Sequence, residues 1–206
     1  MVYLSLGSNI GDRESNLAQA TMALSINFEI SDIVSSSYYE TEPLYNEDQP
    51  DFLNSVVRFS TTLKPFDVLD IVQKVERMLG RPEKREKNQP RLIDIDILFH
   101  GDAVIETEEL SLPHPMVSLR KFILIPFAEV EPDFQIPHSN LTIKDLINFL
   151  LFFSHEKKAK IPLKRRIKKL PLSPVDKTKV KDVSDINKLK IENLFNLKVI
   201  RAKKVQ

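Results

Sequence analysis

Two aspartates interrupt an apolar stretch of the chain and give the first chemical signal in the sequence. Residues 92–99 are otherwise apolar and β-branched, which favours a buried strand, and Asp94 and Asp96 lie within them. Because side chains alternate faces along a strand, both carboxylates should point the same way, roughly 6–7 Å apart. Two like charges there are unfavourable without a cation, and Mg²⁺ binds one or two carboxylates together with water and phosphate. The pattern predicts a magnesium site; the alternative is an edge strand with solvated aspartates.

Basic residues gather immediately upstream of the two aspartates. Arg91 precedes the strand and can offer a fixed positive charge to a phosphate. Residues 80–87 hold Arg81, Lys84 and Arg85. Charge runs are usually solvated, but the position of this one indicates a source of cations for the aspartate site.

Three further features have both a structural and a functional interpretation. The glycine-containing segment 7–11 is either a small phosphate cradle before a helix or a tight turn, and it lacks the lysine of a P-loop, which favours the turn. His114 stands alone between two prolines and is by pattern a structural loop histidine. Phe52 and Phe122 are, by composition, core residues.

The elements that must position these residues follow from hydrophobic spacing and turn signals. We expect strands at 2–6, 30–39, 52–63 and 92–99, helices at 13–26, 65–79, 122–129 and 142–153, and a short hairpin at 104–112. The order of the first six elements, β-α-β-β-α-β, predicts an α+β fold, a ferredoxin-like split β-α-β sandwich. Its sheet should be mostly antiparallel, with the helices on one face.

The composition excludes several classes of protein. The chain of 206 residues has no cysteine, which excludes disulfides and thiolate metal sites and fits a reducing cytoplasm. No run approaches the length of a membrane span, and the first residues lack the basic start of a signal peptide. We therefore expect a cytoplasmic protein with no membrane partner.

The charge is unevenly distributed, although the net charge is only +1. Residues 154–206 carry 17 of the 30 Lys and Arg but 5 of the 29 Asp and Glu, so the tail is basic and the body acidic. We predict a folded domain at 1–153 and a basic, largely disordered extension at 154–206. The alternative for the extension is an arm that contacts RNA, a membrane surface or the acidic body.

Taken together, the segments resemble the hydroxymethyl-dihydropterin pyrophosphokinase family of folate biosynthesis, over about residues 1–150. The resemblance rests on Leu-Gly-Ser-Asn-Ile-Gly-Asp at 6–12, Tyr-Glu-Thr-Glu-Pro-Leu at 39–44, Asp-Gln-Pro-Asp-Phe-Leu-Asn at 48–54, Glu76 with Gly80-Arg81, Pro-Arg-Leu-Ile-Asp-Ile-Asp-Ile-Leu at 90–98, Leu-Pro-His-Pro at 112–115 and Arg-Lys-Phe-Ile-Leu-Ile-Pro at 120–126. The fold of that family is the ferredoxin-like sandwich expected from periodicity.

The resemblance implies transfer of the β,γ-pyrophosphate of ATP, as co-substrate, to 6-hydroxymethyl-7,8-dihydropterin, with AMP as the other product. It implies catalytic roles for Arg81, Arg91, Asp94 and Asp96, the two aspartates binding two Mg²⁺. The residues implied to contact ATP are Glu76, Arg81, Lys84, Arg91, Ile97, His114 and Arg120. Those implied to contact the pterin are Thr41, Pro43, Leu44, Phe52, Asn54 and Phe122, with the two phenyl rings on either side of it. A monomer that needs no nucleic acid is expected.

The chain departs from the family pattern at several positions. Glu83 replaces a second arginine of the phosphate loop, Asn88 an aromatic residue, and Phe52 a frequent tyrosine. Glu109 stands where a basic residue can occur. We expect these changes to affect nucleotide affinity and loop closure more than the reaction.

Two other functions remain open from the residues alone. One is a nucleotidyltransferase-like enzyme that uses the same two-aspartate geometry on another acceptor. The other is a nucleic-acid-binding module that uses the basic tail, although the sequence lacks an aromatic RNA-binding strand motif. For the enzyme, we expect loops 42–51 and 81–90 to be mobile without ligand and to close over ATP.

Overall fold

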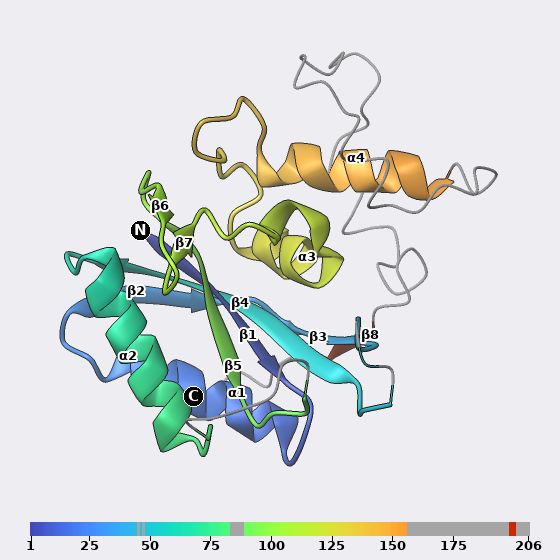
Figure 1. The fold of residues 1–206 in the computed structure, drawn as a ribbon. Helices are drawn as coiled ribbons and strands as arrows, with labels where there is room; N and C mark the ends of the chain where they lie inside the picture. Colours follow the sequence, from blue (N-terminus) through green and yellow to red (C-terminus); the bar gives the residue numbers. More distant parts are fainter. Residues whose placement is uncertain (45, 47, 83–88, 156–197, 201–206) are drawn as a thin grey trace.

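The chain folds around an antiparallel sheet (Figure 1). The computed structural model describes residues 1–44, 46, 48–82, 89–155 and 198–200. The elements in order are β1 (Val2–Ser8), α1 (Arg13–Ser25), β2 (Ile30–Ser35), β3 (Tyr38–Thr41), β4 (Phe52–Thr61), α2 (Pro65–Met78), β5 (Asp94–His100), β6 (Ile105–Glu106), β7 (Ser111–Leu112), a 3₁₀ turn (Val117–Leu119), α3 (Lys121–Val130), α4 (Ile143–His155) and β8 (Lys198–Ile200).

The sheet has the mostly antiparallel character expected from the sequence. Within the described residues, strands pair in the order β5-β1-β4-β3-β8, and β2 joins β4 beside β3. All of these pairings are antiparallel. The short hairpin expected at 104–112 is confirmed as β6 and β7, whose residues Ile105 and Leu112 are cross-strand partners.

Local signals set the boundaries of the first two helices. The Asp12 side chain caps α1 by accepting a hydrogen bond from the Ser15 N–H at 3.0 Å. Pro65 begins α2, where its fixed φ and missing N–H are tolerated. Gly80 follows the end of α2 with a φ of 91°, a left-handed conformation that favours glycine. The sequence therefore predicts both helices to within a residue or two.

Helices α1 and α2 of the β-α-β-β-α-β unit lie on one face of the sheet, as expected, and α3 and α4 cover the other face. On one face, Leu4 and Leu6 of β1 pack with residues of α1 and α2 such as Leu17 and Val72. On the other face, Tyr3 packs with residues of α3 and α4. Figure 1 shows the two helix pairs on opposite sides of the strands. The reason is that all seven residues of β1 are apolar enough, or small enough, to be buried.

The strand expected at 30–39 is instead two strands. Ser36 lies at the break between β2 and β3. Its N–H donates to the Val56 carbonyl at 2.9 Å, and the Val56 N–H donates to the Ser36 hydroxyl at 3.0 Å. Ser37 next donates its N–H to Glu129 of α3 at 2.8 Å. These two serines therefore bond to β4 and α3 at the point where the chain divides into β2 and β3.

The boundary between domain and extension lies mostly outside the described residues. Helix α4 continues to His155, two residues past the expected domain end at 153. Of the extension, Lys198–Ile200 form β8, which pairs with β3 through Tyr38–Ile200, Tyr39–Val199 and Glu40–Lys198. The expectation of a largely disordered extension otherwise falls on residues that the structure does not describe.

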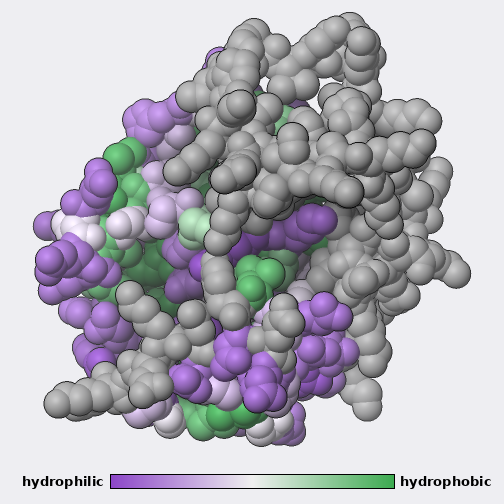
Figure 2. All heavy atoms as spheres, turned by 45° about the vertical axis from the view of Figure 1, so that its right-hand side comes forward, coloured by the Kyte–Doolittle hydropathy of each residue, from purple (hydrophilic) through white to green (hydrophobic). Residues whose placement is uncertain are grey.

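Polar side chains predominate on the described part of one face of the molecule (Figure 2). Figure 2 shows hydrophilic side chains over much of one face, with hydrophobic ones in smaller patches between them. The helices of the described ranges include none with the length and apolar character that crossing a bilayer requires.

We predict that the aromatic cluster on the α3 face contributes strongly to stability. Phe127 is fully buried, and its ring stacks on Tyr3 with centroids 4.7 Å apart and meets Phe99 edge-on at 5.6 Å. Phe127→Ala should lower the free energy of unfolding by about 3–5 kcal/mol, because it leaves a cavity that the neighbours cannot fill. Urea unfolding measures this. The control Phe28→Ala, at a ring that is 94% exposed, should change it by less than about 0.5 kcal/mol; equal losses would contradict the assignment of the core.

Candidate active site

The two aspartates of β5 meet the predicted ligand-binding residues in one cavity. Asp94 pairs with Gly7 and Asp96 with Ser5 in the β1–β5 register, and both carboxylates face the side of the sheet that carries α3. The cavity has a volume of about 220 Å³. The predicted site residues that line it are Thr41, Leu44, Phe52, Asn54, Arg91, Asp94, Asp96, His114, Arg120 and Phe122.

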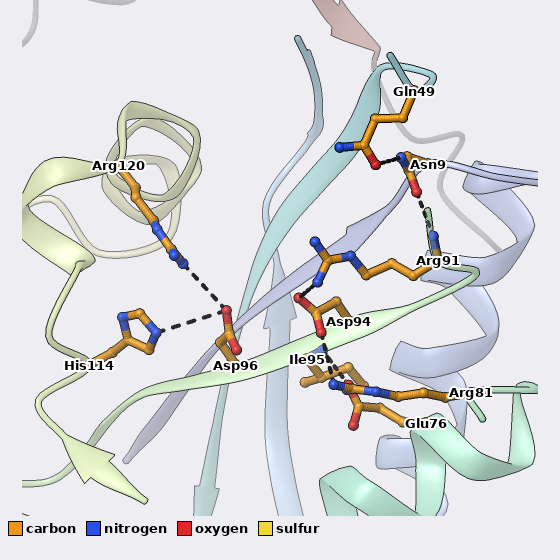
Figure 3. A network of polar contacts seen from close by, with 10 residues as sticks. All are labelled: Asn9, Gln49, Glu76, Arg81, Arg91, Asp94, Ile95, Asp96, His114 and Arg120. Carbon is orange, nitrogen blue, oxygen red and sulfur yellow. Dashed lines mark hydrogen bonds and ion pairs between the residues drawn. The ribbon is translucent and has the colours of Figure 1, made fainter. Parts of the chain in front are cut away.

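Asp94 lies between two arginines (Figure 3). The Arg91 Nη1 is 2.7 Å from Asp94 Oδ2, and the Arg81 Nη2 is 3.3 Å from Asp94 Oδ1. Arg91 lies in the segment that leads into β5, and Arg81 lies in the turn after α2. The expected gathering of cations at the aspartate strand is therefore confirmed for these two side chains.

Asp96 has weaker charge compensation. Among the described residues, Arg120 approaches it with Nη1 3.6 Å from Asp96 Oδ2. Desolvation in the cavity and the neighbouring negative charge of Asp94 raise the pKa of Asp96 to about 6, although Arg120, Arg91 and Arg81 act in the opposite direction. A carboxylate that the protein alone leaves undercompensated is one that an added cation would stabilise.

His114 is a neutral hydrogen-bond donor pointing towards Asp96. The Met116 N–H donates to His114 Nδ1 at 3.2 Å, so the ring proton is on Nε2, which lies 4.0 Å from Asp96 Oδ2. Burial first, and the positive charge of Arg120 second, lower the pKa of His114 to about 4. The contact is therefore not an ion pair at neutral pH. The pattern favoured a structural loop histidine, whereas the side chain faces the candidate site.

Glu76 fixes the strand from outside the cavity. Glu76 is only 4% exposed, and its Oε1 accepts a hydrogen bond from the Ile95 N–H, between the two aspartates, at 2.8 Å. The same oxygen pairs with Arg81, which also reaches Asp94. Glu76 does not line the cavity, so the structure links it to the site through Ile95 and Arg81.

Two phenyl rings in the cavity wall each lie against an arginine guanidinium. The guanidinium carbon of Arg91 lies 5.2 Å from the centroid of Phe52, and that of Arg120 lies 5.7 Å from the centroid of Phe122. Cation–π attraction helps to orient both cations. The Nε atoms of Arg91 and Arg120 are buried and have no hydrogen-bond partner among the described residues. Both arginines thus keep donor capacity that suits an anion.

The buried amide of Asn54, on β4, also lines the cavity. Asn54 is 3% exposed, and its Nδ2 donates to Thr41 Oγ1 at 2.9 Å and to the Tyr39 carbonyl at 3.3 Å. These bonds fix the plane of the amide. Gly7 makes room beside it, because a Cβ at that position would lie 3.3 Å from Asn54 Oδ1. The glycine signal in segment 7–11 thus reflects a close approach in the cavity wall.

Several predicted residues lie elsewhere. The Ile97 side chain packs in the core with α1 and α2, on the face away from the cavity. Pro43 is partly buried in the loop between Glu42 and Leu44 but does not line the cavity. Lys84, together with Glu83 and Asn88, lies outside the described residues, as does much of the loop 81–90.

Sequence reasoning missed one residue that joins two loops. Asn9 donates through Nδ2 to Gln49 Oε1 at 3.0 Å and to the Pro50 carbonyl at 3.1 Å, and its Oδ1 accepts from the Arg91 N–H at 2.7 Å. Asn9 is only 1% exposed. The signal was the asparagine in segment 7–11, which we interpreted as part of a tight turn or a small phosphate cradle.

The carboxylates fit a hard cation that takes most of its ligands from elsewhere. The described residues contain no cluster of three or more His, Cys, Asp or Glu arranged to bind a metal. Two aspartates on one strand face, inside a cavity with arginine walls, have the donor chemistry that suits Mg²⁺ when phosphate and water supply its other ligands.

Comparison with known proteins gives the family. The family model described as 7,8-dihydro-6-hydroxymethylpterin-pyrophosphokinase (HPPK) matches residues 3–132. The 2-amino-4-hydroxy-6-hydroxymethyldihydropteridine pyrophosphokinase of Bacillus subtilis is 44% identical over 130 residues, which are 63% of this chain and 77% of that protein. The folic acid synthesis protein FOL1 of Dictyostelium discoideum is 37% identical over 142 residues, 69% of this chain but 21% of that protein.

The fold is also found among solved structures. The crystal structure of wild-type Plasmodium falciparum HPPK-DHPS matches with a TM-score of 0.59 at 17% identity, over 76% of this chain and 46% of that one. This chain therefore spans less than half of the longer proteins that it matches. With the family model covering more than half of its residues, the chain belongs to the 7,8-dihydro-6-hydroxymethylpterin-pyrophosphokinase family.

Proposed function

We propose that this chain transfers the β,γ-pyrophosphate of ATP to the hydroxymethyl group of 6-hydroxymethyl-7,8-dihydropterin, in folate biosynthesis, and releases AMP. The hydroxyl oxygen forms a bond to the β-phosphorus, and the bond from the β-phosphorus to the oxygen of AMP breaks. The main observation behind the proposal is that Asp94 and Asp96 line the same cavity as two phenyl rings, each of which makes a cation–π contact with an arginine. Family membership supports the same reaction.

The two aspartates are the proposed metal ligands. Asp94 and Asp96 would hold two Mg²⁺, which, when bound, neutralise phosphate charge and orient the transferred group. Asp94 is held by Arg91 and Arg81, so these arginines already lie at the place where phosphate charge would enter. An arginine released from Asp94 would be able to bind a phosphate oxygen.

Arg81, Arg91, His114 and Arg120 are proposed to bind the ATP phosphates. Arg91 and Arg120 have the unpartnered Nε atoms described above, and the Nε2–H of His114 is a donor in the same wall. His114 would add a hydrogen bond without a full charge, and the three arginines would add positive charge, so the four groups together would stabilise the transferred phosphate. Lys84, Glu76 and Ile97 are proposed as further ATP contacts, the last two through the backbone or through neighbours.

The pterin is proposed to lie between Phe52 and Phe122. A flat aromatic ring gains from two ring faces, and the fixed amide of Asn54 would hydrogen-bond its polar edge. Thr41 and Leu44 line the same end of the cavity, and Pro43 shapes the loop that carries them. A site of this kind would reject rings that lack the polar edge.

The wider arrangement is also part of the proposal. The order β5-β1-β4 with β2 and β3 beyond it supports a ferredoxin-like classification of the body. We propose residues 1–153 as the catalytic domain and 154–206 as an appended basic segment, in a cytoplasmic monomer that needs no nucleic acid.

The first test is the loss of one proposed metal ligand. Asp96→Asn should lower the rate of AMP formation from ATP, Mg²⁺ and the pterin by about 10³-fold or more, because an amide cannot replace the carboxylate charge. The measurement is AMP release resolved by chromatography. The control Asp102→Asn, at an exposed residue just past the same strand, should retain activity. Release of pyrophosphate in place of AMP by the unaltered chain would indicate a nucleotidyltransferase instead.

The same change should stabilise the ligand-free protein. The pKa of Asp96 is raised to about 6 from 3.8, so the folded state binds this proton more tightly than the unfolded state does. That contribution is complete below pH 3.8 and is lost as the pH rises through 6. Asp96→Asn should therefore gain about 1 kcal/mol at pH 7.5, a value reduced for partial exposure, and less at pH 5. Urea unfolding at both pH values measures this, and a gain larger at pH 5 would contradict it.

The stacking role is tested by removing one ring. Phe122→Ala should weaken pterin binding about 10- to 100-fold, the range expected for loss of one aromatic face. Isothermal titration with the pterin, in the presence of a non-hydrolysable ATP analogue and Mg²⁺, gives the dissociation constant. The control is Phe66→Ala, at a ring on α2 that is 42% exposed and outside the cavity lining. If both variants bind the pterin as the unaltered chain does, the proposed stacking is wrong.

A further inference from the structure

Arg13 lies outside the cavity and bonds to the chain at both ends of the loop 42–51, which contributes lining residues to the cavity. Arg13 is the first residue of α1. Its Nη1 donates to the Asp51 carbonyl at 2.7 Å, and its Nη2 pairs with Glu40 Oε1, also at 2.7 Å. Glu40 comes just before Thr41, and Asp51 just before Phe52, so one guanidinium contacts the chain where the loop 42–51 leaves β3 and where it enters β4.

The alternation of strand side chains explains why Arg13 does not itself line the cavity. In the β3–β4 register, Tyr39 pairs with Asn54, Glu40 with Leu53 and Thr41 with Phe52. Leu53 packs in the core shared with α1, whereas Asn54 and Phe52 line the cavity. Glu40 therefore points to the α1 side, and its neighbour Thr41 to the cavity side. Arg13 acts on the site through the backbone between them.

The two contacts of Arg13 would fix the distance between Glu40 and Asp51, which a simple charge pair would not do. The guanidinium is a planar, rigid fork, and here its two terminal nitrogens bind one acceptor on β3, Glu40, and one directly before β4, the Asp51 carbonyl. The side chains of Arg13 and Glu40 are 28% and 18% exposed, so both are partly shielded from solvent. A lysine has a single ammonium on a flexible stem and would not hold the two acceptors at a fixed separation.

Two groups of the cavity depend on that separation. The Asn54 amide bonds to Thr41 Oγ1 and to the Tyr39 carbonyl, so its orientation follows the spacing of β3 and β4. The Phe52 ring begins β4 directly after Asp51. A shift at the base of the loop would therefore move a proposed stacking ring and a proposed hydrogen-bonding amide together.

We propose that Arg13 is a positioning residue that sets the affinity of the site for the pterin, by fixing the base of the loop 42–51. The inference rests on the proposed function. It assigns Arg13 no contact with substrate. It predicts a larger effect on the pterin than on ATP, because Phe52 and Asn54 follow the base of this loop directly, whereas the phosphate-side Arg91 is linked to it through its contact with the Phe52 ring.

The experiment compares the variants Arg13→Met and Arg13→Lys with the unaltered chain in the AMP-release assay. Arg13→Met should raise the KM for the pterin about 10-fold and leave the KM for ATP and the kcat within about 2-fold. Arg13→Lys retains the charge but bridges only one acceptor, so its KM for the pterin should fall between the two. The matched control Arg77→Met removes an exposed arginine of α2 and should change none of these constants.

The possible failures are distinguishable. An unchanged pterin KM in Arg13→Met would overturn the role of Arg13, and so would an equal rise in the KM values for both substrates, which indicates general loss of structure. Melting curves of both Arg13 variants exclude measurements on unfolded protein. If Arg13→Met does not fold, the pterin KM of Arg13→Lys decides the question, and an unchanged value there would overturn the role. Absence of AMP formation by the unaltered chain would instead overturn the proposed function.

Discussion

The repulsion between two carboxylates on one face of β5 is the constraint around which this molecule is built. Asp94 and Asp96 cannot both be charged in a shielded cavity without nearby compensation. Asp94 receives it from Arg81 and Arg91 at short range, and Asp96 receives less, from Arg120. Glu76 holds the strand between them by its bond to the Ile95 N–H. The fold thus maintains an arrangement that is unfavourable in the free protein and that a bound cation would relieve.

The compensating cations also connect the two halves of the cavity. Arg91 pairs with Asp94 and lies over Phe52, and Arg120 approaches Asp96 and lies over Phe122. Each arginine therefore touches a carboxylate on one side and a phenyl ring on the other. Under the proposed function, a nucleotide that draws an arginine away from its aspartate would also alter the ring that receives the pterin, so the two substrates would not bind independently.

Much of the geometry was accessible from the sequence, because it follows from period and turn chemistry. The spacing of Asp94 and Asp96 predicts a shared face, which is confirmed, and Pro65 and Gly80 mark the ends of α2. The position of Ser36 was not predictable in the same way. Its hydroxyl takes over a ladder bond to Val56 and splits a strand that β-branched and aromatic residues favour.

Residues that depend on long-range contacts were harder to assign. Composition places Phe52 and Phe122 in the core, and only the resemblance to a family placed them in a binding site. His114 has no periodic context, so its orientation towards Asp96 depends on a loop bonded to Leu98 of β5. Ile97 shows the reverse case: it lies beside Asp96 in sequence, yet alternation directs its side chain to the opposite core.

The two-sided burial of β1 determines how much chain the site needs. The family match ends at residue 132, before α4 begins. Yet Ile143 and Ile147 of α4 are almost fully buried in the same cluster as Tyr3 and Phe99. A polypeptide shortened to the matched region would lack α4, so apolar side chains of this cluster would be exposed to water. We therefore expect a stably folded piece of this chain to extend beyond the region that identifies its family.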